Sequence, residues 1–320
     1  MPDIVTIGEA SIDFVSTETD VSLRDATTFE KMIGGGPATV AMGLARLEVP
    51  SGFVGRVGDD PFGRYLADVL ATEGVDVTQL SFERKARTAL TFVSLGSPGE
   101  GDRVFFRHPS ADQFLSPGHI NPSYVKTARC IVYGSLALMA EPGRTAVLKA
   151  LAIARDSRAL RVYDLRYHLS LWGSDSEARY GLHLGLERAE VVRLGLDDLE
   201  FLSGTRDVVE GTQALWSDRM RLLVVTLGAQ GCAYRTASDF GQVAGCRVQT
   251  VDATGAAAGF LAGLLAELLW PAGRRAEPSF GRTQVERALH FANAAGALTT
   301  TQWGASAALP TRPQVEALCG

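Results

Sequence analysis

From residue 130 onward, short apolar segments typical of buried strands alternate with longer segments of helical periodicity. The strand-like segments are 130–133, 161–163, 191–194 and 222–226, and a helical pattern runs to about residue 155. This alternation favours a parallel sheet covered by helices, because parallel neighbours need a crossover connection. A further apolar run at 4–7 ends in Gly8 and predicts a buried strand near the N-terminus.

Two β-rich stretches interrupt this alternation, at about 14–33 and 88–107, and the second contains a turn signal at 97–101. We expect the two stretches to pair as a small separate sheet. Such a sheet would form a lid over a cleft at the carboxyl ends of the parallel strands, where open α/β folds bind ligands. No internal repeat or long linker divides the chain, so we expect one domain over residues 1–320 with the lid inserted in it.

The composition excludes several classes of protein. With 46% hydrophobic and 21% charged residues it is typical of a soluble globular protein, and the net charge of −5 gives no basic field for nucleic acid. No apolar run approaches the ~20 residues of a membrane helix, and Asp3 and Glu9 interrupt the first apolar run, so neither a membrane partner nor a signal peptide is expected. The four cysteines lie far apart, without metal-ligand spacing, which indicates free thiols and a cytoplasmic location.

A glycine- and alanine-rich segment, Val-Asp-Ala-Thr-Gly-Ala-Ala-Ala-Gly-Phe at 251–260, opens an apolar helical pattern. Free N–H groups at the start of a helix, together with the helix dipole, bind anions. The segment therefore predicts an anion site built from the backbone of residues 255–258, namely Gly255, Ala256, Ala257 and Ala258. The alternative is a simple strand-to-helix cap, because Asp and Thr commonly cap helices.

Further segments carry glycine and polar residues at fixed spacings, and each of them alone is weak evidence. They are 8–13, 34–41, 58–63, 107–112, 164–172, 226–231, 293–297 and 304–305. Taken singly, Asp13 could be a solvated strand end, Arg107 and Arg166 could be surface charges, and the glycines at 34–36 could form a turn.

Together and in this order, the segments resemble the ribokinase/PfkB family of sugar kinases over about residues 3–316. Residues 34–41 resemble the family's G-G-x-P-x-N-x-A, and 251–260 resemble D-T-T-G-A-G-D-A-F. Residues 164–172 resemble the D-x-N-x-R-x-x-L-W of the ketodeoxygluconate- and fructose-kinase branch. The resemblance implies a ribokinase-like three-layer α/β sandwich with a central, mostly parallel sheet and a small β-sheet lid.

The resemblance also implies the ligands: ATP with Mg²⁺, and a sugar or sugar acid as the acceptor. A monovalent cation near Asp252 and a homodimer through the lid are also implied. The implied sugar-binding residues are Asp13, Gly34, Gly35, Thr39, Arg107 and Arg166. The implied nucleotide-binding residues are Asp198, Thr226, Gly228, Gly231 and Asn293, and Asp198 would also contact the metal through water.

Several positions depart from the family's pattern. The family's general base, the second Asp of its phosphate-binding motif, is Ala258 here, and an alanine accepts no proton. The Asn of an N-x-x-E motif that organises magnesium is Gly195, and the sugar-contacting Asn is Thr39. In D-x-N-x-R, Asn is replaced by Arg166 and Arg by His168.

Two functions remain open from the sequence. One is a sugar kinase impaired by loss of its base, a loss that costs roughly 10²–10⁴-fold in rate. The other is a catalytically silent pseudokinase that acts as a sugar or nucleotide sensor or as a partner subunit. Arg107 and Arg166 could both face a carboxylate, so they weakly favour a sugar acid as the substrate.

Overall fold

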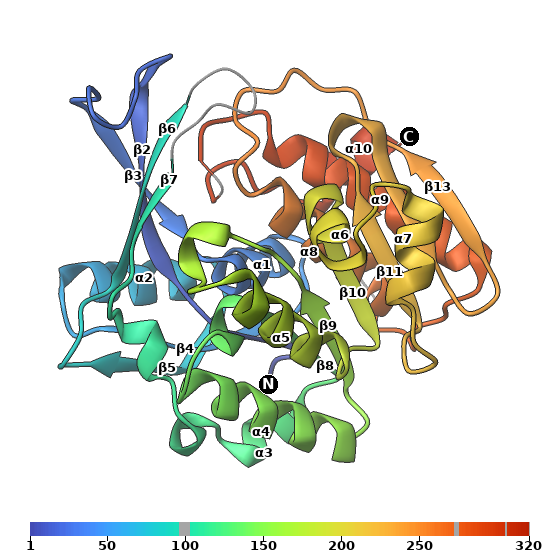
Figure 1. Ribbon diagram of the computed structural model, residues 1–320, viewed down its shortest axis with the longest axis horizontal. Helices are drawn as coiled ribbons and strands as arrows, with labels where there is room; N and C mark the ends of the chain where they lie inside the picture. Colours follow the sequence, from blue (N-terminus) through green and yellow to red (C-terminus); the bar gives the residue numbers. More distant parts are fainter. Residues whose placement is uncertain (96–102, 272–274, 305, 320) are drawn as a thin grey trace.

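The computed structural model describes residues 1–95, 103–271, 275–304 and 306–319. A nine-stranded sheet lies between two layers of helices, and a four-stranded sheet stands apart from it (Figure 1). The order in the large sheet is β13-β12-β11-β10-β9-β8-β1-β4-β5. Its strands are β1 Ile4–Ile7, β4 Ser51–Gly58, β5 Asp76–Glu83, β8 Cys130–Gly134, β9 Leu160–Asp164, β10 Val191–Gly195, β11 Leu222–Thr226, β12 Gly231–Arg235 and β13 Phe240–Ala244.

The large sheet is parallel from β5 to β11, and only β12 and β13 run antiparallel to their neighbours. Successive residues of a strand face opposite layers, which explains the near-continuous apolar runs in the sequence. Ile4 belongs to one buried cluster and Val5 to the other. The parallel sheet expected from the alternation is therefore present.

Helices cover both faces. On one face lie α1 Gly36–Arg46, α2 Pro61–Thr72, α8 Ala256–Leu269, α9 Arg282–Thr299 and α10 Arg312–Cys319. On the other lie α3 Pro122–Thr127, α4 Gly143–Asp156, α5 Asp175–Leu186, α6 Leu196–Ser203 and α7 Val208–Leu215. Short 3₁₀ turns are η1 Ala111–Phe114, η2 Pro117–His119, η3 Leu136–Leu138, η4 Leu169–Leu171 and η5 Gly228–Gln230. Among the described helices none has the length and apolarity that a bilayer crossing requires.

The small sheet is the separate one expected from the two β-rich stretches. Its order is β3-β2-β6-β7, with β2 Ser11–Thr19, β3 Phe29–Gly34, β6 Ala89–Leu95 and β7 Arg103–Phe106. The first stretch begins three residues earlier than expected, at Ser11, because β2 follows β1 almost directly. The expected turn at 97–101 lies outside the described residues.

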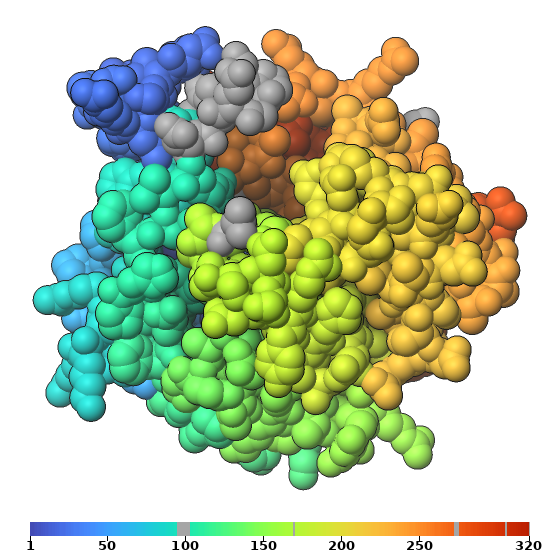
Figure 2. All heavy atoms as spheres, viewed as in Figure 1, coloured from blue at the N-terminus to red at the C-terminus, as the bar shows by residue number. Residues whose placement is uncertain are grey.

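A row of aromatic rings holds this small sheet together. Phe14 stacks on Phe92 with ring centroids 5.1 Å apart, and Phe29 and Phe106 meet Phe92 edge-on. In Figure 1 the small sheet, blue to teal, projects from the large sheet towards the orange C-terminal segments. Figure 2 shows the molecular surface hollowed between these two parts.

The strand order reverses between β1 and β8. From β1 the chain adds β4 and β5 on one side, and β8 to β13 then build the sheet on the other side. The carboxyl ends of parallel strands at such a reversal point line a crevice that binds ligands in open α/β folds. The candidate site lies there.

Candidate functional site

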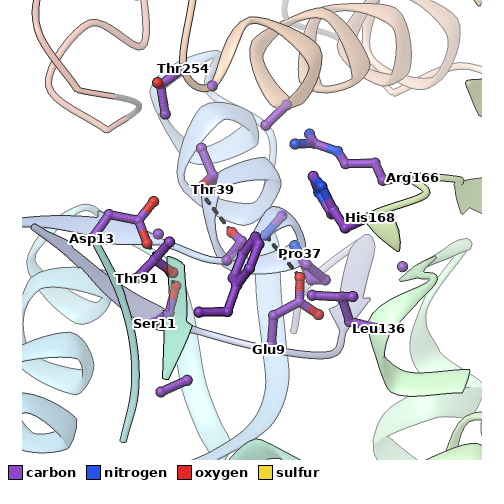
Figure 3. Close-up of a pocket in the computed structure, with 18 of the residues that line it drawn as sticks. Glu9, Ser11, Asp13, Pro37, Thr39, Thr91, Leu136, Arg166, His168 and Thr254 are labelled. Atoms are coloured by element: carbon purple, nitrogen blue, oxygen red, sulfur yellow. Dashed lines mark hydrogen bonds between the residues drawn. The ribbon is translucent and has the colours of Figure 1, made fainter. Parts of the chain in front are cut away.

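A cavity of about 380 Å³ lies at this reversal point. The ends of β1, β8 and β9 form its floor, the small sheet forms one wall, and the start of α8 closes it from above. All six of the sugar-binding residues expected from the sequence line it: Asp13, Gly34, Gly35, Thr39, Arg107 and Arg166. Residues from seven separate chain segments therefore meet around one cavity (Figure 3).

Asp13 on β2 presents a buried carboxylate to the cavity; 5% of the residue is exposed. The Ser11 hydroxyl donates to its Oδ1 atom at 3.1 Å. Burial raises the pKa of this carboxyl, and Arg103 and a hydrogen bond from Thr91 oppose the rise. Asp13 is thus an oriented hydrogen-bond acceptor and not the solvated strand end that the sequence left open.

Gly34 lies directly against this carboxylate. A Cβ atom on Gly34 would fall 2.1 Å from Oδ1 of Asp13, so any other residue here would displace Asp13. Gly35 follows with φ of 89°, a left-handed conformation that favours glycine. Thr39, one turn into α1, donates its hydroxyl to the Gly35 carbonyl at 2.9 Å. These glycines form a close approach of backbone to the cavity, which a simple surface turn would not need.

Arg107 is buried, but its charge is already paired. Nε donates to Oδ2 of Asp112 at 2.9 Å, and Nη2 donates to the same oxygen. Nη1 contacts Sδ of Met139. Arg107 therefore holds the 107–112 loop against the cavity, and the guanidinium that the sequence offered to a substrate carboxylate is neutralised within the protein.

Arg166 is the freer of the two arginines. Its Nε donates to Oδ2 of Asp164 at 3.3 Å, while Oδ1 of Asp164 accepts from Arg193. The Nη2 atom of Arg166 is buried and has no hydrogen-bond partner among the described residues. Figure 3 shows its side chain beside that of His168, with both directed into the cavity. The Arg166 side chain is 31% exposed, so the guanidinium reaches the cavity although its Nη2 atom is itself shielded.

Glu9, which the sequence analysis did not single out, also lines the cavity. It is 7% exposed; Oε1 accepts from the Gly36 N–H at 3.1 Å, and Oε2 is buried without a partner among the described residues. Burial raises the pKa of Glu9 to about 7, against the attraction of Arg107. A carboxylate two residues beyond a buried strand, in the same segment as Asp13, is the signal that could have identified it.

The first turn of α8 supplies backbone donors. Gly255 precedes the helix with φ of 86°, and the amides of Gly255 and Ala257 have no partner among the described residues. The amide of Ala256 donates to the Ala253 carbonyl, and that of Ala258 donates to the Gly255 carbonyl. The anion site therefore has fewer free amides than expected, because two of its four N–H groups already donate to carbonyls within the turn.

A second cavity, of about 680 Å³, lies on the other side of this turn. Four of the nucleotide residues expected from the sequence line it: Thr226, Gly228, Gly231 and Asn293. Asn293 donates to the carbonyls of Val243 and Ala244 at 3.2 and 3.0 Å, which ties α9 to the end of β13. Both cavities are lined by Ala253 and Ala257, so they meet at the start of α8.

Comparison with known proteins decides the family. The family model described as pfkB family carbohydrate kinase matches residues 1–312. The chain belongs to the pfkB family of carbohydrate kinases. A probable fructokinase-4 from Arabidopsis thaliana is 42% identical over 316 residues, covering 98% of this chain and 96% of the relative.

Solved structures agree with this assignment. A fructokinase double mutant from Vibrio cholerae O395, in fructose, ADP and potassium ion bound form, is 32% identical with a TM-score of 0.87; the match covers 99% of this chain and 98% of that one. The fructokinase from Xylella fastidiosa with bound ATP is 29% identical with a TM-score of 0.88 and the same coverage. The expected ribokinase-like α/β fold with a separate small sheet is confirmed.

One residue that the pfkB resemblance assigned to the nucleotide lies elsewhere. Asp198, in the first turn of α6, is absent from the lining of both cavities. Its Oδ2 accepts from the Gly195 N–H and its Oδ1 from the Tyr167 N–H, each at 2.8 Å. The Asp198 carboxylate therefore holds the 164–172 segment in place. Among the described residues, no cluster of three or more His, Cys, Asp or Glu side chains could hold a metal ion.

Asp252 has a similar organising position in this pfkB protein. Its Oδ1 accepts from the Thr254 N–H at 2.8 Å and its Oδ2 from the Gly304 N–H at 2.9 Å. It joins the loop before α8 to the segment that follows α9. The sequence left open that this segment is a strand-to-helix cap. Asp252 does hold the turn before α8, and the same turn leaves the Gly255 and Ala257 amides free for a ligand.

Proposed function

We propose that this protein is an ATP-dependent sugar kinase that acts on a neutral ketose such as fructose and transfers the phosphoryl group slowly. The supporting observation is the meeting of two cavities at the first turn of α8. A sugar in one and a nucleotide in the other would face each other beside the free amides of Gly255 and Ala257. The pfkB relatives named fructokinases, including one described with fructose and ADP bound, support this pair of ligands.

The nucleotide would occupy the larger cavity. Val248 and Phe260 offer apolar surface for a base, and the glycines at 228 and 231 let the backbone approach closely. The phosphates would then extend to the start of α8, where unpaired amides and the helix dipole favour negative charge. ATP supplies the phosphoryl group, and the protein supplies position and electrostatic stabilisation.

The sugar would bind through hydroxyl contacts. Asp13 can accept from a sugar hydroxyl, while Ser11 and Thr91 hold its carboxylate in place. Asp112 neutralises Arg107, so the guanidiniums that remain for an anionic group are those of Arg166, which also contacts Asp164, and of the exposed Arg103. The relatives named fructokinases favour a neutral ketose over a sugar acid, contrary to the weak preference drawn from the sequence.

Slow transfer follows from Ala258. It lines the sugar cavity, is 1% exposed and carries only a methyl group, and the motif resemblance aligns it with the family's proton acceptor. Losing a general base costs roughly 10²–10⁴-fold in rate, although positioning and electrostatics persist. We expect turnover below that of a pfkB kinase with an intact carboxylate.

The cations are also part of the proposal. A magnesium ion would arrive with the nucleotide phosphates, since Asp198 is engaged by two backbone amides and could reach an ion only through water. A monovalent cation would lie near Asp252, whose carboxylate borders the anion site. The related fructokinase with bound potassium supports this second expectation.

Steady-state kinetics test the proposal directly. Purified protein with ATP and Mg²⁺ is assayed for phosphorylated product with fructose, glucose and gluconate as acceptors. We expect slow but saturable turnover with fructose, weaker turnover with gluconate, and loss of fructose saturation in Asp13→Asn. Gluconate exceeding fructose would reverse the assigned substrate class.

A silent sugar or nucleotide sensor is the second candidate, and the engaged amides of Ala256 and Ala258 favour it. Calorimetry distinguishes the two. Saturable binding of ATP and fructose without any phosphorylated product would support the sensor.

Assembly and compartment complete the proposal. The edge strand β7 exposes Phe106, which is 58% accessible, and Val104. We therefore propose a homodimer through the lid sheet, which light scattering can test.

All four cysteines are free thiols, which supports a cytoplasmic location.

A further inference from the structure

We propose that the imidazole of His168 accepts the proton of the sugar hydroxyl in this protein. The inference rests on the proposed kinase function, because it names the proton acceptor of that reaction. Two departures from the pfkB pattern fall in one cavity: Ala258 removes a carboxylate, and His168 replaces an arginine by a side chain with a lone pair. The second departure supplies a proton acceptor at another position in the cavity, which replaces the missing carboxylate only in part.

The placement of His168 suits this role. It follows β9 and lines the same cavity as Ala257 and Ala258, and Ala257 also lines the second cavity. Its ring packs against Phe105 of β7, with centroids 5.4 Å apart. Neither ring nitrogen hydrogen-bonds to a described residue, so both are available to a ligand. Figure 3 shows the imidazole directed into the cavity from the side opposite Asp13.

The protonation state also suits this role. Burial, Arg166 and Arg103 lower the pKa of His168 to about 4, so the ring is neutral at physiological pH and one nitrogen can accept a proton. That basicity is close to the value of about 3.9 for an ordinary aspartate, the residue type it would replace. A neutral acceptor also avoids the repulsion between a carboxylate and the transferring phosphoryl group.

The other titratable groups of the cavity are less suited. Asp164 is engaged by Arg193 and Arg166, and Asp13 accepts from Ser11 on the far wall. The free oxygen of Glu9 is shielded from solvent. Among the described cavity-lining acids and bases, His168 therefore combines an uncommitted acceptor atom with access to the cavity.

The step balances without a further reactant. The hydroxyl proton passes to a ring nitrogen of His168 while the hydroxyl oxygen bonds to the γ-phosphorus of ATP. The bond from that phosphorus to the oxygen bridging to the β-phosphate breaks, and ADP leaves with the electron pair. The imidazolium, next to Arg166 and Arg103, then releases its proton to solvent, because the neighbouring charges favour its neutral form.

A double-mutant cycle on the full chain tests the assignment, with fructose, ATP and Mg²⁺. The variants are His168→Ala, Ala258→Asp and their combination, and His183→Ala on the exposed face of α5 is the matched control. We expect His168→Ala to lower kcat at least ~10²-fold, with little change in KM for ATP. In the Ala258→Asp background the same change should cost less than about threefold, because two acceptors that serve one transition state are non-additive. Added imidazole should restore part of the turnover of His168→Ala, and His183→Ala should behave as wild type.

Three outcomes would overturn the assignment. Equal losses from His168→Ala in both backgrounds, without rescue by imidazole, would show a structural role. Turnover by Ala258→Asp but not by the wild type would reject His168 as acceptor and would favour the silent sensor over the kinase for the wild-type protein. Absence of turnover in every variant, with circular dichroism unchanged, would remove the proposed function and this inference together.

Discussion

Arg107 and Asp112 form a buried ion pair at the edge of the sugar cavity, and both guanidinium contacts go to a single carboxylate oxygen. The pair ties the first of the four residues between β7 and η1 to η1 itself, and it brings Arg107 beside Glu9. It decides the character of the cavity, because an unpaired arginine here would favour an anionic substrate. Removing one partner should therefore affect both stability and selectivity.

The first prediction concerns this pair. Asp112→Asn should destabilise the protein by about 3 kcal/mol, because it leaves a buried guanidinium without its counter-charge. Urea denaturation measures the loss, and Asp156→Asn, in an exposed ion pair with Arg155, should change stability by less than about 1 kcal/mol. If Asp112→Asn lowers the free energy of unfolding by no more than Asp156→Asn does, the Arg107–Asp112 pair makes no net contribution to stability.

Glu9 predicts a pH dependence of stability. Its folded-state pKa of about 7 lies above the ordinary value of 4.5, so the native state binds this proton more tightly than the unfolded chain does. The stabilisation from this proton is complete below about pH 4.5 and is lost as the pH rises through 7. Glu9→Gln should therefore resemble the wild type at pH 5 and exceed it by about 3 kcal/mol at pH 8.

Unfolding curves at the two pH values measure this difference. Glu30→Gln, the same chemical change on the exposed face of β3, serves as the control and should show no such divergence. A Glu9→Gln variant whose stability parallels the wild type from pH 5 to 8 would mean that Glu9 ionises normally.

Much of the fold could be predicted because its central strands are buried on both faces. The segments at 130–133 and 222–226 became β8 and β11 within a residue, since continuous apolar runs mark such strands. Strands β5 and β13 were not predicted. They lie at the two edges of the sheet, and their half-exposed residues mix polar and apolar side chains without a clear pattern.

Some residues of the site could likewise be located from the sequence, and others only from the fold. The resemblance to the family's motifs assigned Asp13, Gly34 and Thr39 to one site, and the structure brings the three to one cavity. The pairing of Arg107 with Asp112 and the two amides that engage Asp198 could not, because they depend on which segments the fold brings together. The sequence marked His168 only as a departure from a motif, and its place in the cavity depends on the fold.

The anion site gives a prediction about the nucleotide. Ala257→Pro removes an N–H group that has no partner among the described residues, at a first-turn position where no internal helix bond is lost. A hydrogen bond to a charged group is worth about 1.5–3 kcal/mol, so ATP affinity should fall roughly 10- to 100-fold. Calorimetry measures it, and Ala257→Ser, which keeps the N–H, should bind nearly as the wild type. Equal affinities for all three proteins would place the phosphates elsewhere.

The last prediction separates the sugar site from the nucleotide site. In Gly34→Ala the added methyl would fall 2.1 Å from Oδ1 and 2.6 Å from Oδ2 of Asp13, so the carboxylate must leave its position. Asp13 would then lose its bond from Ser11 and its alignment towards the cavity. KM for fructose should rise at least ~10-fold, as expected for losing a hydrogen bond to a charged group, while KM for ATP stays unchanged.

Gly118→Ala is the matched control, because its nearest neighbour, Oγ of Ser116, would lie 3.8 Å from the new methyl. It should leave both constants unchanged. An unchanged KM for fructose in Gly34→Ala would show that Asp13 does not hold the sugar, since no arrangement of this backbone accommodates both the methyl and the carboxylate in its present place. A parallel rise in KM for ATP would instead indicate that the change has disturbed α1 and the cavity as a whole.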